Sequence, residues 1–549
     1  MTEWLLHPAA PYVAAAAVAA VAPARVRGGL LVMAGAAAVW LAFTLPSGNT
    51  AGTLMGQALM PLRMDGLARP FAIVFALVGT LGAVYALDVR RRRFHLAACV
   101  ACASALTLVL AGDWITFYAA WEILALASFA LIADGGTARA RGAAYRYLLV
   151  HVAGGACLLG GIVWHVGAGG GLLVQAVPAG GSGMLILIAF LVNAAVPPLH
   201  AWLTDAYPES SPAGGVLLSA FVTKSAVYAL ARVFPGVELL LWAGIVMALW
   251  GVVLAVIEND IRRLLGYHIV SQVGYMVAGI GLGTPLAISG AVAHAFCHIL
   301  YKGLLFMATG AVIQATGRRR LTELGGLGRL MPATLVLYMA GALSISGAPL
   351  LNGFVSKSII VAAAQAEHAT AMEWLLMLAA VGTFVSVGLK LPLQAFGGGP
   401  ATAPPAPVPA PMIWAMSLAA ALCLLLGVWP SLLYRLLPFA VDYRPYTPGH
   451  VFETLEVLLG AALGFVVLGS AVRAKAMVTR DFDRAYRALG RAIALGAGGV
   501  LSRGAATLEA LAYRLVAGAP AAPRALAQPV GYAVLTALVA IGILLAFLA

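Results

Sequence analysis

The residues of this chain that could carry protons are a few ionisable side chains inside long apolar runs. Four of the five lysines lie in such runs, whereas most of the 28 arginines lie between them. Arg keeps its charge in any protein environment, but a buried Lys can lose its proton. This selective use of lysine predicts a proton relay through Lys224, Lys302 and Lys357. A snorkelling or ion-paired lysine is the alternative, and it suits Lys390 best, near the end of its run.

Glu122 is the one carboxylate near the middle of an apolar run, in the segment FYAAWEILALASFALI. An ionisable group at that depth is costly and usually functional. A lysine nearby would favour the charged form of both partners, and a proton or cation moving past the pair would switch both charge states. We therefore expect Glu122 and Lys224 to take part in ion movement.

Three further polar residues recur at intervals of four in the segment AVAHAFCHILYKGLLF. This spacing places His294, His298 and Lys302 on one helix face. Because histidine donates and accepts protons near neutral pH, the trio suits a hydrated proton wire, and a polar seam between helices is the alternative. His268 and Gln272, one turn apart on the preceding run, can extend the wire, although packing explains them equally well. No third ligand accompanies the two histidines, so we expect no metal site.

Composition places these residues in a membrane. Of 549 residues, 62% are hydrophobic and 10% charged, against roughly 45–50% and 25% in ordinary soluble domains. The net charge of +13 has no basic patch with stacking aromatics, so membrane lipid and not nucleic acid is the expected surface. Five scattered cysteines form no disulfide framework or iron–sulfur set, and no nucleotide fingerprint is present, so we expect no cofactor.

About sixteen runs are long enough to cross roughly 30 Å of hydrocarbon. They lie near 9–23, 28–46, 67–88, 95–111, 113–133, 144–166, 183–206, 212–233, 237–257, 266–283, 286–316, 332–366, 374–396, 411–430, 450–470 and 530–549. Two of them are interrupted, by Pro197 and Pro198 and by the sequence SISGAPLLNGF around 344–354. Non-helical backbone at membrane depth must be buried in protein or line a wet cavity, which is typical of a transport path, and a simple proline kink is the alternative.

The positions of the arginines predict the orientation of the chain in the membrane. With the N-terminus outside, every second connection should be cytoplasmic and basic. The basic connections carry Arg25, Arg27, Arg90 to Arg93, Arg139, Arg141, Arg146, Arg262, Arg263, Arg318 to Arg320 and Arg329. The intervening connections hold little beyond Arg63, Arg69 and Arg232. The pattern predicts a multi-pass protein of the cell inner (plasma) membrane with its N-terminus outside.

The last part of the chain changes character. Phe482, Tyr486, Leu489 and Ile493 follow one face of an amphipathic helix, with arginines among them. We expect 471–529 to lie along the cytoplasmic surface and 530–549 to be a terminal transmembrane anchor. A disordered basic linker is the alternative for the surface segment.

Several of these segments occur in an order that resembles a known family. WEILALASFALI, PPLHAWLTDAYPESSPAGGVLLSAFVTKSAVYALAR, YHIVSQVGYM, AHAFCHILYKGLLF and SISGAPLLNGFVSKSII are similar to the antiporter-like subunits of respiratory complex I and of Mrp-type multisubunit cation/proton antiporters. The motifs are most similar to those of the Mrp D subunits, and the resemblance covers roughly residues 60–430.

The resemblance implies an all-α polytopic membrane protein with a 14-helix core, two inverted five-helix repeats and broken helices. The expected parts are N-terminal spans (1–94), a first repeat (95–233), a second repeat (234–396), a Pro-rich loop with following spans (397–470), the surface segment (471–529) and the anchor (530–549).

The resemblance also implies roles for single residues. Glu122 and Lys224 match the glutamate and lysine of the first half-channel, His294, His298 and Lys302 match the central relay, and Lys357 matches the exit residue. One position departs, because Asn193 stands where the family has a lysine. Asn can hydrogen-bond a carboxylate but cannot neutralise it, so either Lys224 takes over as the partner of Glu122 or the first half-channel is impaired.

The expected function is therefore that of a proton-translocating subunit of a cation/proton antiporter, without redox chemistry of its own. Its partners would be other membrane subunits of a hetero-oligomeric complex, with protons and Na⁺ as the candidate moving ions. The alternatives are a membrane-arm subunit of an NADH:quinone oxidoreductase or membrane-bound hydrogenase, a degenerate scaffold, and a protein that drives inorganic carbon uptake with a zinc-containing soluble partner.

Overall fold

The computed structural model describes residues 6–54, 57–397 and 404–472, together with single positions at 475, 481, 482, 484 and 488. The chain divides into two compact units, and the second, residues 480–547, lies almost entirely outside the described residues. Apart from its first two residues and those single positions, the expected surface segment 471–529 lies outside them as well, as does the expected anchor 530–549.

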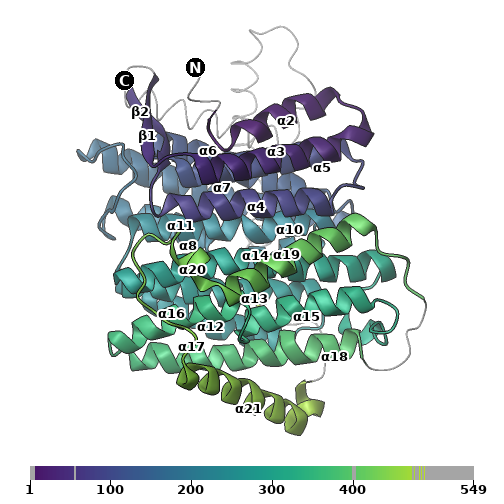
Figure 1. Ribbon diagram of the computed structural model, residues 1–549. Helices are drawn as coiled ribbons and strands as arrows, with labels where there is room; N and C mark the ends of the chain where they lie inside the picture. The colour runs from purple at the N-terminus through teal and green to yellow at the C-terminus, as the bar shows by residue number, and fades with distance from the viewer. Residues whose placement is uncertain are drawn as a thin grey trace. The chain divides into compact units, whose positions relative to one another are not determined.

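The first unit is a bundle of long helices that run side by side (Figure 1). In chain order its helices are α2 (Ala10–Val21), α3 (Ala24–Thr44), α4 (Ala68–Tyr85), α5 (Arg92–Leu110), α6 (Trp114–Ala133), α7 (Ala138–Gly167), α8 (Ser182–Asn193), α9 (Ala201–Ala206), α10 (Pro212–Ala220), α11 (Val222–Val233), α12 (Glu238–Ile257), α13 (Ile261–Leu282), α14 (Pro285–Thr316), α15 (Pro332–Ser346), α16 (Asn352–Ala366), α17 (Thr370–Thr383), α18 (Leu391–Ala395), α19 (Ala410–Val428), α20 (Pro430–Tyr434) and α21 (Pro448–Val472). Short 3-10 turns η1 (Tyr207–Glu209) and η2 (Leu321–Glu323) and a π-helix, η3 (Phe384–Lys390), complete them.

Every span expected between residues 9 and 470 corresponds to one helix or to consecutive helical segments. Among the described residues, eleven helical segments are long and apolar enough to cross a membrane, and α2, α8 and α15 are shorter apolar helices. The expected all-α polytopic membrane fold is therefore confirmed.

Both expected helix breaks are present. The first separates α8 from α9 over residues 194–200, and the second separates α15 from α16 over residues 347–351. Gly347 ends α15 in the left-handed conformation, at φ 80°, which glycine adopts without strain. Two further interruptions are not predicted by the sequence, a break at Phe221 between α10 and α11 and the π-helix η3.

A β-hairpin, also not predicted, connects α3 with α4. Its strands β1 (Gly48–Leu54) and β2 (Gln57–Met64) pair antiparallel, with Gly48 opposite Met64. Asp113 fixes the hairpin to the start of α6, because its carboxylate accepts a hydrogen bond from the Met60 amide at 2.8 Å and also caps α6 through the Thr116 amide at 2.7 Å. One buried aspartate thus joins the hairpin to the helix that carries Glu122.

Ion pairs show which connections lie at the same end of the bundle. At one end, Asp134 accepts from Arg91 at 2.6 Å and Arg93 at 3.2 Å, and Arg319 bridges Glu209 and Asp260 at 2.6 Å each. These residues all lie in connections that the arginine pattern groups on one side. At the other end, Arg232 meets Asp65 at 2.7 Å, and Arg63 meets the same carboxylate at 2.9 Å. The alternation of connections inferred from the arginines therefore agrees with the arrangement of the bundle.

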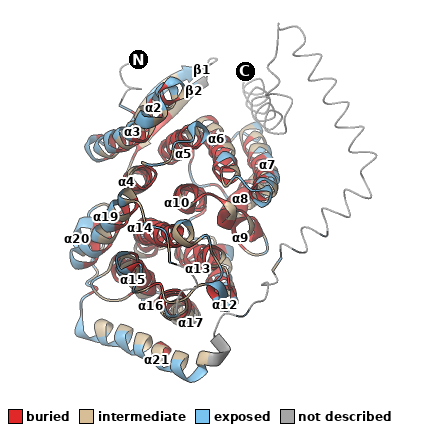
Figure 2. Cartoon of the chain, turned by 90° about the vertical axis from the view of Figure 1, so that its right-hand side faces the viewer, coloured by how far each residue is buried: buried red, intermediate tan, exposed pale blue. Residues whose placement is uncertain are grey.

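The most buried helices are those that carry the candidate ionisable residues. Within the spanning windows of α14 and of the α10–α11 pair, 94% of residues are buried, and Figure 2 shows α14, α10 and α13 at the centre of the bundle. Small residues permit this close packing. A Cβ on Gly244 of α12 would overlap the Ala278 amide nitrogen of α13, so these two helices meet backbone to backbone.

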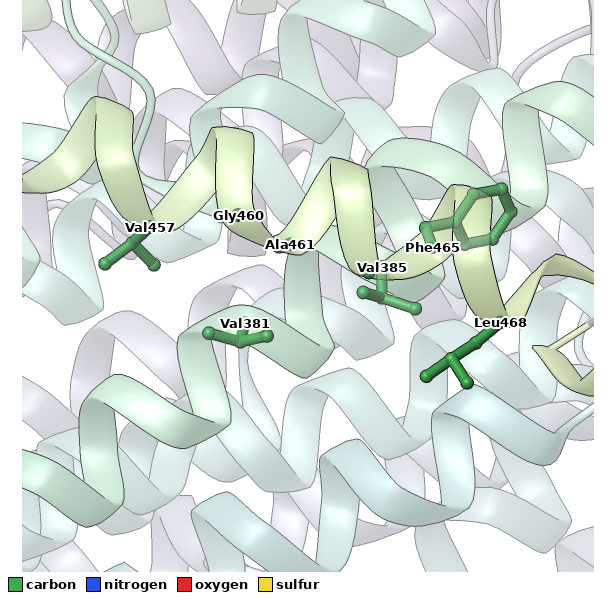
Figure 3. Close-up of a pocket in the computed structure, with 8 residues that line it drawn as sticks. Val381, Val385, Val457, Gly460, Ala461, Phe465 and Leu468 are labelled. Atoms are coloured by element: carbon green, nitrogen blue, oxygen red, sulfur yellow. The ribbon is translucent and has the colours of Figure 1, made fainter.

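Helix α21 lies at the edge of this unit and packs lightly. Only 6% of its spanning window is buried, and Figure 2 shows its exposed face. An apolar groove separates it from α17 and η3 (Figure 3), lined by Val381, Val385, Val457, Gly460, Ala461, Gly464, Phe465 and Leu468. Its outer face therefore remains available to lipid or to another subunit.

The Asp65–Arg232 pair predicts a specific pH dependence of stability. Burial opposes ionisation of Asp65, but hydrogen bonds from Arg232 and its charge outweigh burial and lower the pKa of Asp65 from 3.8 to about 2. Because the folded state holds this carboxylate ionised, its contribution to stability is fully present above pH 3.8 and is lost as the pH falls towards 2. We expect Asp65→Asn to lower the melting temperature of the detergent-solubilised protein at neutral pH and to flatten its decline between pH 4 and pH 2. Equal curves for both proteins would contradict this.

Candidate functional site

The second helix break positions Lys357. Where α15 ends, its last carbonyls have no amide partner within the helix, as at any helix C-terminus. Lys357, on α16, donates a hydrogen bond from Nζ to the Ile345 carbonyl at 2.5 Å, and its ammonium lies 5.1 Å from the centre of the Tyr275 ring. The break thus provides both a carbonyl ligand and an aromatic face for a lysine deep in the bundle.

Close packing holds this break in place. A Cβ on Gly353 would overlap the Ser344 carbonyl oxygen, so the start of α16 touches the end of α15 directly. The Ser344 hydroxyl donates to the Asn352 side chain across the same gap. Gly353 therefore permits the close approach that places Lys357 against Ile345.

The three residues predicted on one helix face lie together in the core of α14. His294, His298 and Lys302 are fully buried, and the two imidazole centres are 6.2 Å apart. His294 Nδ1 lies 3.2 Å from the Ser356 hydroxyl of α16, and its Nε2 lies 3.4 Å from the Tyr301 hydroxyl. Within the described part of the chain, neither nitrogen of His298 has a hydrogen-bond partner, and neither does Lys302 Nζ.

His268 and Gln272 lie beside this row on α13. The Tyr301 hydroxyl is 3.5 Å from Gln272 Oε1, which links Gln272 to His294 through one side chain. His268 Nε2 is 2.7 Å from the Ser386 hydroxyl in η3. Tyr301 and the π-helix were both missed by sequence reasoning. A tyrosine one residue before Lys302 gives no distinctive signal, and π-helices have no reliable sequence signature, although they recur at functional sites.

Lys390 lies in a different environment from the other lysines. Its Nζ donates to the carbonyls of Val256 at 2.5 Å and Glu258 at 2.7 Å, where α12 ends. A lysine at a helix C-terminus satisfies its last carbonyls and its negative dipole end. In this position Lys390 can hold the end of α12.

Lys224 follows the unpredicted break at Phe221. Its Nζ donates to the Ser219 carbonyl at 2.7 Å and to the Thr223 hydroxyl at 3.0 Å, so the break supplies the acceptor, as it does for Lys357. The charges of Lys224 and Lys357 both act on Lys302, so each of these two lysines lies within electrostatic reach of Lys302. Lys224 is fully buried, and neither of its hydrogen bonds goes to Glu122.

The side chains of Glu122, on α6, and Asn193, on α8, lie beside neighbouring glycines of α7. Helix α7 packs against both α6 and α8. Glu122 Oε1 occupies the place that a Cβ of Gly155 would take, and Asn193 Oδ1 lies 3.9 Å from the corresponding point on Gly154. Each oxygen is buried without a hydrogen-bond partner among the described residues. The structure therefore places a carboxylate and a neutral amide beside two consecutive glycines of α7.

The described residues contain no group of three or more His, Cys, Asp or Glu side chains that could hold a metal ion. The site is built instead from single ionisable groups on separate helices. Helix α14 carries the centre of this row, the α10–α11 pair and α16 flank it, and α6 carries the carboxylate. Such an arrangement can move charge across the bundle in steps.

Comparison with known proteins assigns the chain to a family. The family model described as NADH:quinone oxidoreductase/Mrp antiporter, TM, matches residues 111–388, about half of the chain. The chain therefore belongs to this family, a class of integral membrane proteins. The matched segment contains every candidate residue from Glu122 to Lys357, and the resemblance seen in the sequence motifs is confirmed.

The relatives are named either as subunits of cation/proton antiporters or as subunits of NADH-quinone oxidoreductase. A probable K(+)/H(+) antiporter A/B subunit of Rhizobium meliloti (strain 1021) is 33% identical over 56% of this chain and 33% of its own length. The N subunit of NADH-quinone oxidoreductase of Desulforudis audaxviator is 34% identical over 55% of this chain and 66% of its own length. The Na(+)/H(+) antiporter D subunit of Alkalihalophilus pseudofirmus is 32% identical over 46% and 56%. The matches thus span between one third and two thirds of these relatives.

Solved structures share the fold. A chain of the Mrp complex from Dietzia sp. DQ12-45-1b superposes with a TM-score of 0.71 at 24% identity, covering 83% of this chain and all of that one. A chain of the membrane-bound sulfane sulfur reductase, an archaeal respiratory membrane complex, superposes with a TM-score of 0.76 at 22% identity, covering 93% and 100%. Both similarities concern the fold of the membrane subunit.

The close contact at Gly353 predicts an asymmetry between two glycine substitutions. In Gly353→Ala the added methyl group must displace the Ser344 backbone, and such overpacking typically costs about 1–3 kcal/mol. In Gly464→Ala, on α21, the methyl group meets no atom within 4 Å. We expect Gly353→Ala to lower the melting temperature of the solubilised protein clearly and Gly464→Ala to leave it unchanged or slightly raised. A similar melting temperature for both variants would contradict the close approach of α15 and α16.

Proposed function

We propose that this chain is the proton-translocating membrane subunit of a multisubunit monovalent cation/proton antiporter, similar to the relatives named as D subunits. The observation that carries the proposal is a row of buried ionisable groups on the central helices, from Lys224 through Lys302, His298 and His294 to Lys357. Burying such groups in a membrane bundle is costly and is usually retained for function.

The first step of the relay is the coupling between lysines. Helix α10 packs against α14, and the charges of Lys224 and Lys357 act on Lys302. Because like charges in a poorly solvated interior repel strongly, protonation of one lysine favours release of the proton from its neighbour. Lys302 is the natural intermediate, since its ammonium has no fixed hydrogen-bond partner among the described residues.

The second step passes along α14 towards the second break. His298 lies one turn before Lys302, and His294 one turn further, with Ser356 beside it. Ser356 directly precedes Lys357, so the row continues from α14 onto α16. Proton transfer along it needs rotation of side chains and bridging water, which histidine and serine support.

The accessory residues form a side branch. Gln272 connects the row, through Tyr301, to Thr383 at the end of α17. His268, one turn before Gln272 on α13, contacts Ser386 in the π-helix. Lys390 lies at the end of this branch, where it holds the last carbonyls of α12. We assign Lys390 a structural role, with the branch as a second route to the same end of the bundle.

The proton is the ion that this site suits best. Hard cations such as Na⁺ require several oxygen ligands, whereas Glu122 is the one carboxylate among the proposed relay residues. We assign cation movement to other membrane subunits of the complex and redox chemistry, where a related complex has it, to its partners. The exposed faces of α21 and its neighbours offer surface for such contacts.

The orientation follows from the arginines. We place the end of the bundle that carries Asp134, Glu209 and Asp260 with their arginine partners in the cytoplasm, because positive residues are retained on that side. The N-terminus and the β-hairpin then lie outside the inner membrane.

Two substitutions test the proposal. We expect Glu122→Gln and Lys224→Ala, each in the intact complex in inverted membrane vesicles, to reduce antiport by at least about tenfold, because each removes a proton-binding group from the row. Antiport is measured by fluorescence quenching of a pH-sensitive dye, and assembly by native gel electrophoresis.

The matched controls are Glu238→Gln and Lys475→Ala, which change the same residue types at exposed positions. They should transport like the wild type. Normal antiport in both Glu122→Gln and Lys224→Ala, with normal amounts of complex, would overturn the proposed function.

A further inference from the structure

A buried histidine that the sequence motifs do not include lies one helical turn from Glu122. His151 is on α7, three residues before Gly154 and four before Gly155. Residues at these spacings lie on one helix face. The Glu122 carboxylate occupies the place of the missing Gly155 side chain, and Asn193 meets Gly154. His151 is therefore the next side chain along α7 from both.

The surroundings of His151 hold it in one orientation. Its ring stacks on Tyr147 at 3.8 Å between centres, and the Trp202 ring meets it edge-on at 4.5 Å. Nδ1 lies 2.9 Å from the Tyr147 carbonyl, whereas Nε2 is buried without a partner among the described residues. A carbonyl can only accept, so Nδ1 carries the hydrogen and Nε2 presents a free lone pair. His151 is thus arranged to accept a proton at Nε2.

Glu122 needs a group of this kind. A carboxylate in a poorly solvated interior requires a positive partner to ionise. Asn193 is neutral, and Lys224 directs its hydrogen bonds to Ser219 and Thr223 in its own segment. By contrast, Glu122 Oε1 lies within about 8 Å of the His151 Cβ, given the usual 5–6 Å between Cβ atoms one turn apart.

We propose that His151 is the proton-accepting partner of Glu122 and supplies the positive charge that the neutral Asn193 cannot. In the forward step the O–H bond of the Glu122 carboxylic acid breaks and an Nε2–H bond forms, which leaves a carboxylate and an imidazolium. The reverse step restores two neutral groups. The inference rests on the proposed function, because it adds a residue to the same proton path.

The groups around His151 indicate where α7 leads from Glu122. Tyr147, the residue on which the His151 ring stacks, lies one further turn along α7 from Gly155. Tyr207 packs edge-on against Trp202 at 5.7 Å. Arg146 and Asp205 form an ion pair at 2.6 Å where α7 and α9 approach the end of the bundle. The column from Glu122 through His151 and Tyr147 thus leads towards the arginine-rich end.

The test compares four forms of the intact complex in inverted vesicles. His151→Phe keeps an aromatic ring between Tyr147 and Trp202 but cannot bind a proton. Asn193→Lys introduces an ammonium on α8 at the position beside Gly154. The double variant contains both changes. His165→Phe, near the opposite end of α7 and half-buried, is the matched control.

We expect His151→Phe to reduce antiport by at least about tenfold and His165→Phe to leave it unchanged. Asn193→Lys should restore antiport in the double variant to within about threefold of the wild type, since a lysine there can again neutralise Glu122. A residue with a merely structural role would not be rescued by a charge on another helix. If His151→Phe does not assemble, His151→Gln, which can still donate to the Tyr147 carbonyl, takes its place in the same comparison.

Two results would overturn the inference: wild-type antiport in His151→Phe, or a double variant as inactive as His151→Phe although the complex is intact. The Glu122→Gln variant separates this failure from that of the proposed function. An inactive Glu122→Gln beside a normal His151→Phe rejects only the role of His151. Normal antiport in both Glu122→Gln and Lys224→Ala rejects the proton path as a whole.

Discussion

The scarcity of hydrogen-bonding partners outside the protein in the hydrocarbon region is the constraint on which this structure depends. Each buried donor must find its acceptor within the protein. Within an intact helix each carbonyl already accepts one backbone hydrogen bond, whereas helix ends leave four carbonyls unpaired. Lys224 uses the Ser219 carbonyl before the break at Phe221, and Lys357 uses the Ile345 carbonyl before the break at Gly347. The interruptions in the spans are thus the places where the protein can hold a lysine.

The same constraint divides the buried ionisable groups into two sets. Lys224, Lys357 and Lys390 are held by carbonyls at helix ends. Lys302 and the Glu122 Oε1 oxygen are buried without a hydrogen-bond partner among the described residues. A buried ionisable group without a hydrogen-bond partner raises the free energy of the folded protein in either charge state. An approaching proton or opposite charge stabilises such a group. We interpret the unpartnered groups as points of the proton path that have no fixed hydrogen bond, Lys224 and Lys357 as points of the same path that the helix breaks hold in place, and Lys390 as a structural charge outside the path.

Sequence reasoning recovers the fold well, because the membrane enforces long apolar runs and arginine marks their ends. It also finds the two breaks that contain proline or several glycines, since these residues change backbone geometry directly. It misses the break at Phe221 and the π-helix η3, where ordinary residues leave the helix for reasons of packing. It misses the hairpin as well, because Asp113 stabilises β2 from a distant part of the chain.

For the candidate site, residue type is informative where that type is rare. A lysine or glutamate in an apolar run is conspicuous, whereas Tyr301 is one aromatic residue among many. His151 is equally difficult to recognise from the sequence. Its proximity to Glu122 depends on Gly155, which has no side chain, so the carboxylate of another helix occupies the place of the missing Cβ. The neutral Asn193 is recognised from sequence, but only the three-dimensional arrangement offers a group that can compensate for it.

The central claim is that the unpartnered Lys302 carries protons, whereas the carbonyl-bound Lys390 holds a helix end. The most direct measurement compares Lys302→Met with Lys390→Met in the intact complex, recording antiport and melting temperature for each. The account predicts that Lys302→Met loses antiport without losing stability, because it removes an unpaired buried ammonium. It predicts that Lys390→Met lowers the melting temperature, because the carbonyls of Val256 and Glu258 lose their donor. Normal antiport together with reduced stability in Lys302→Met would contradict the account.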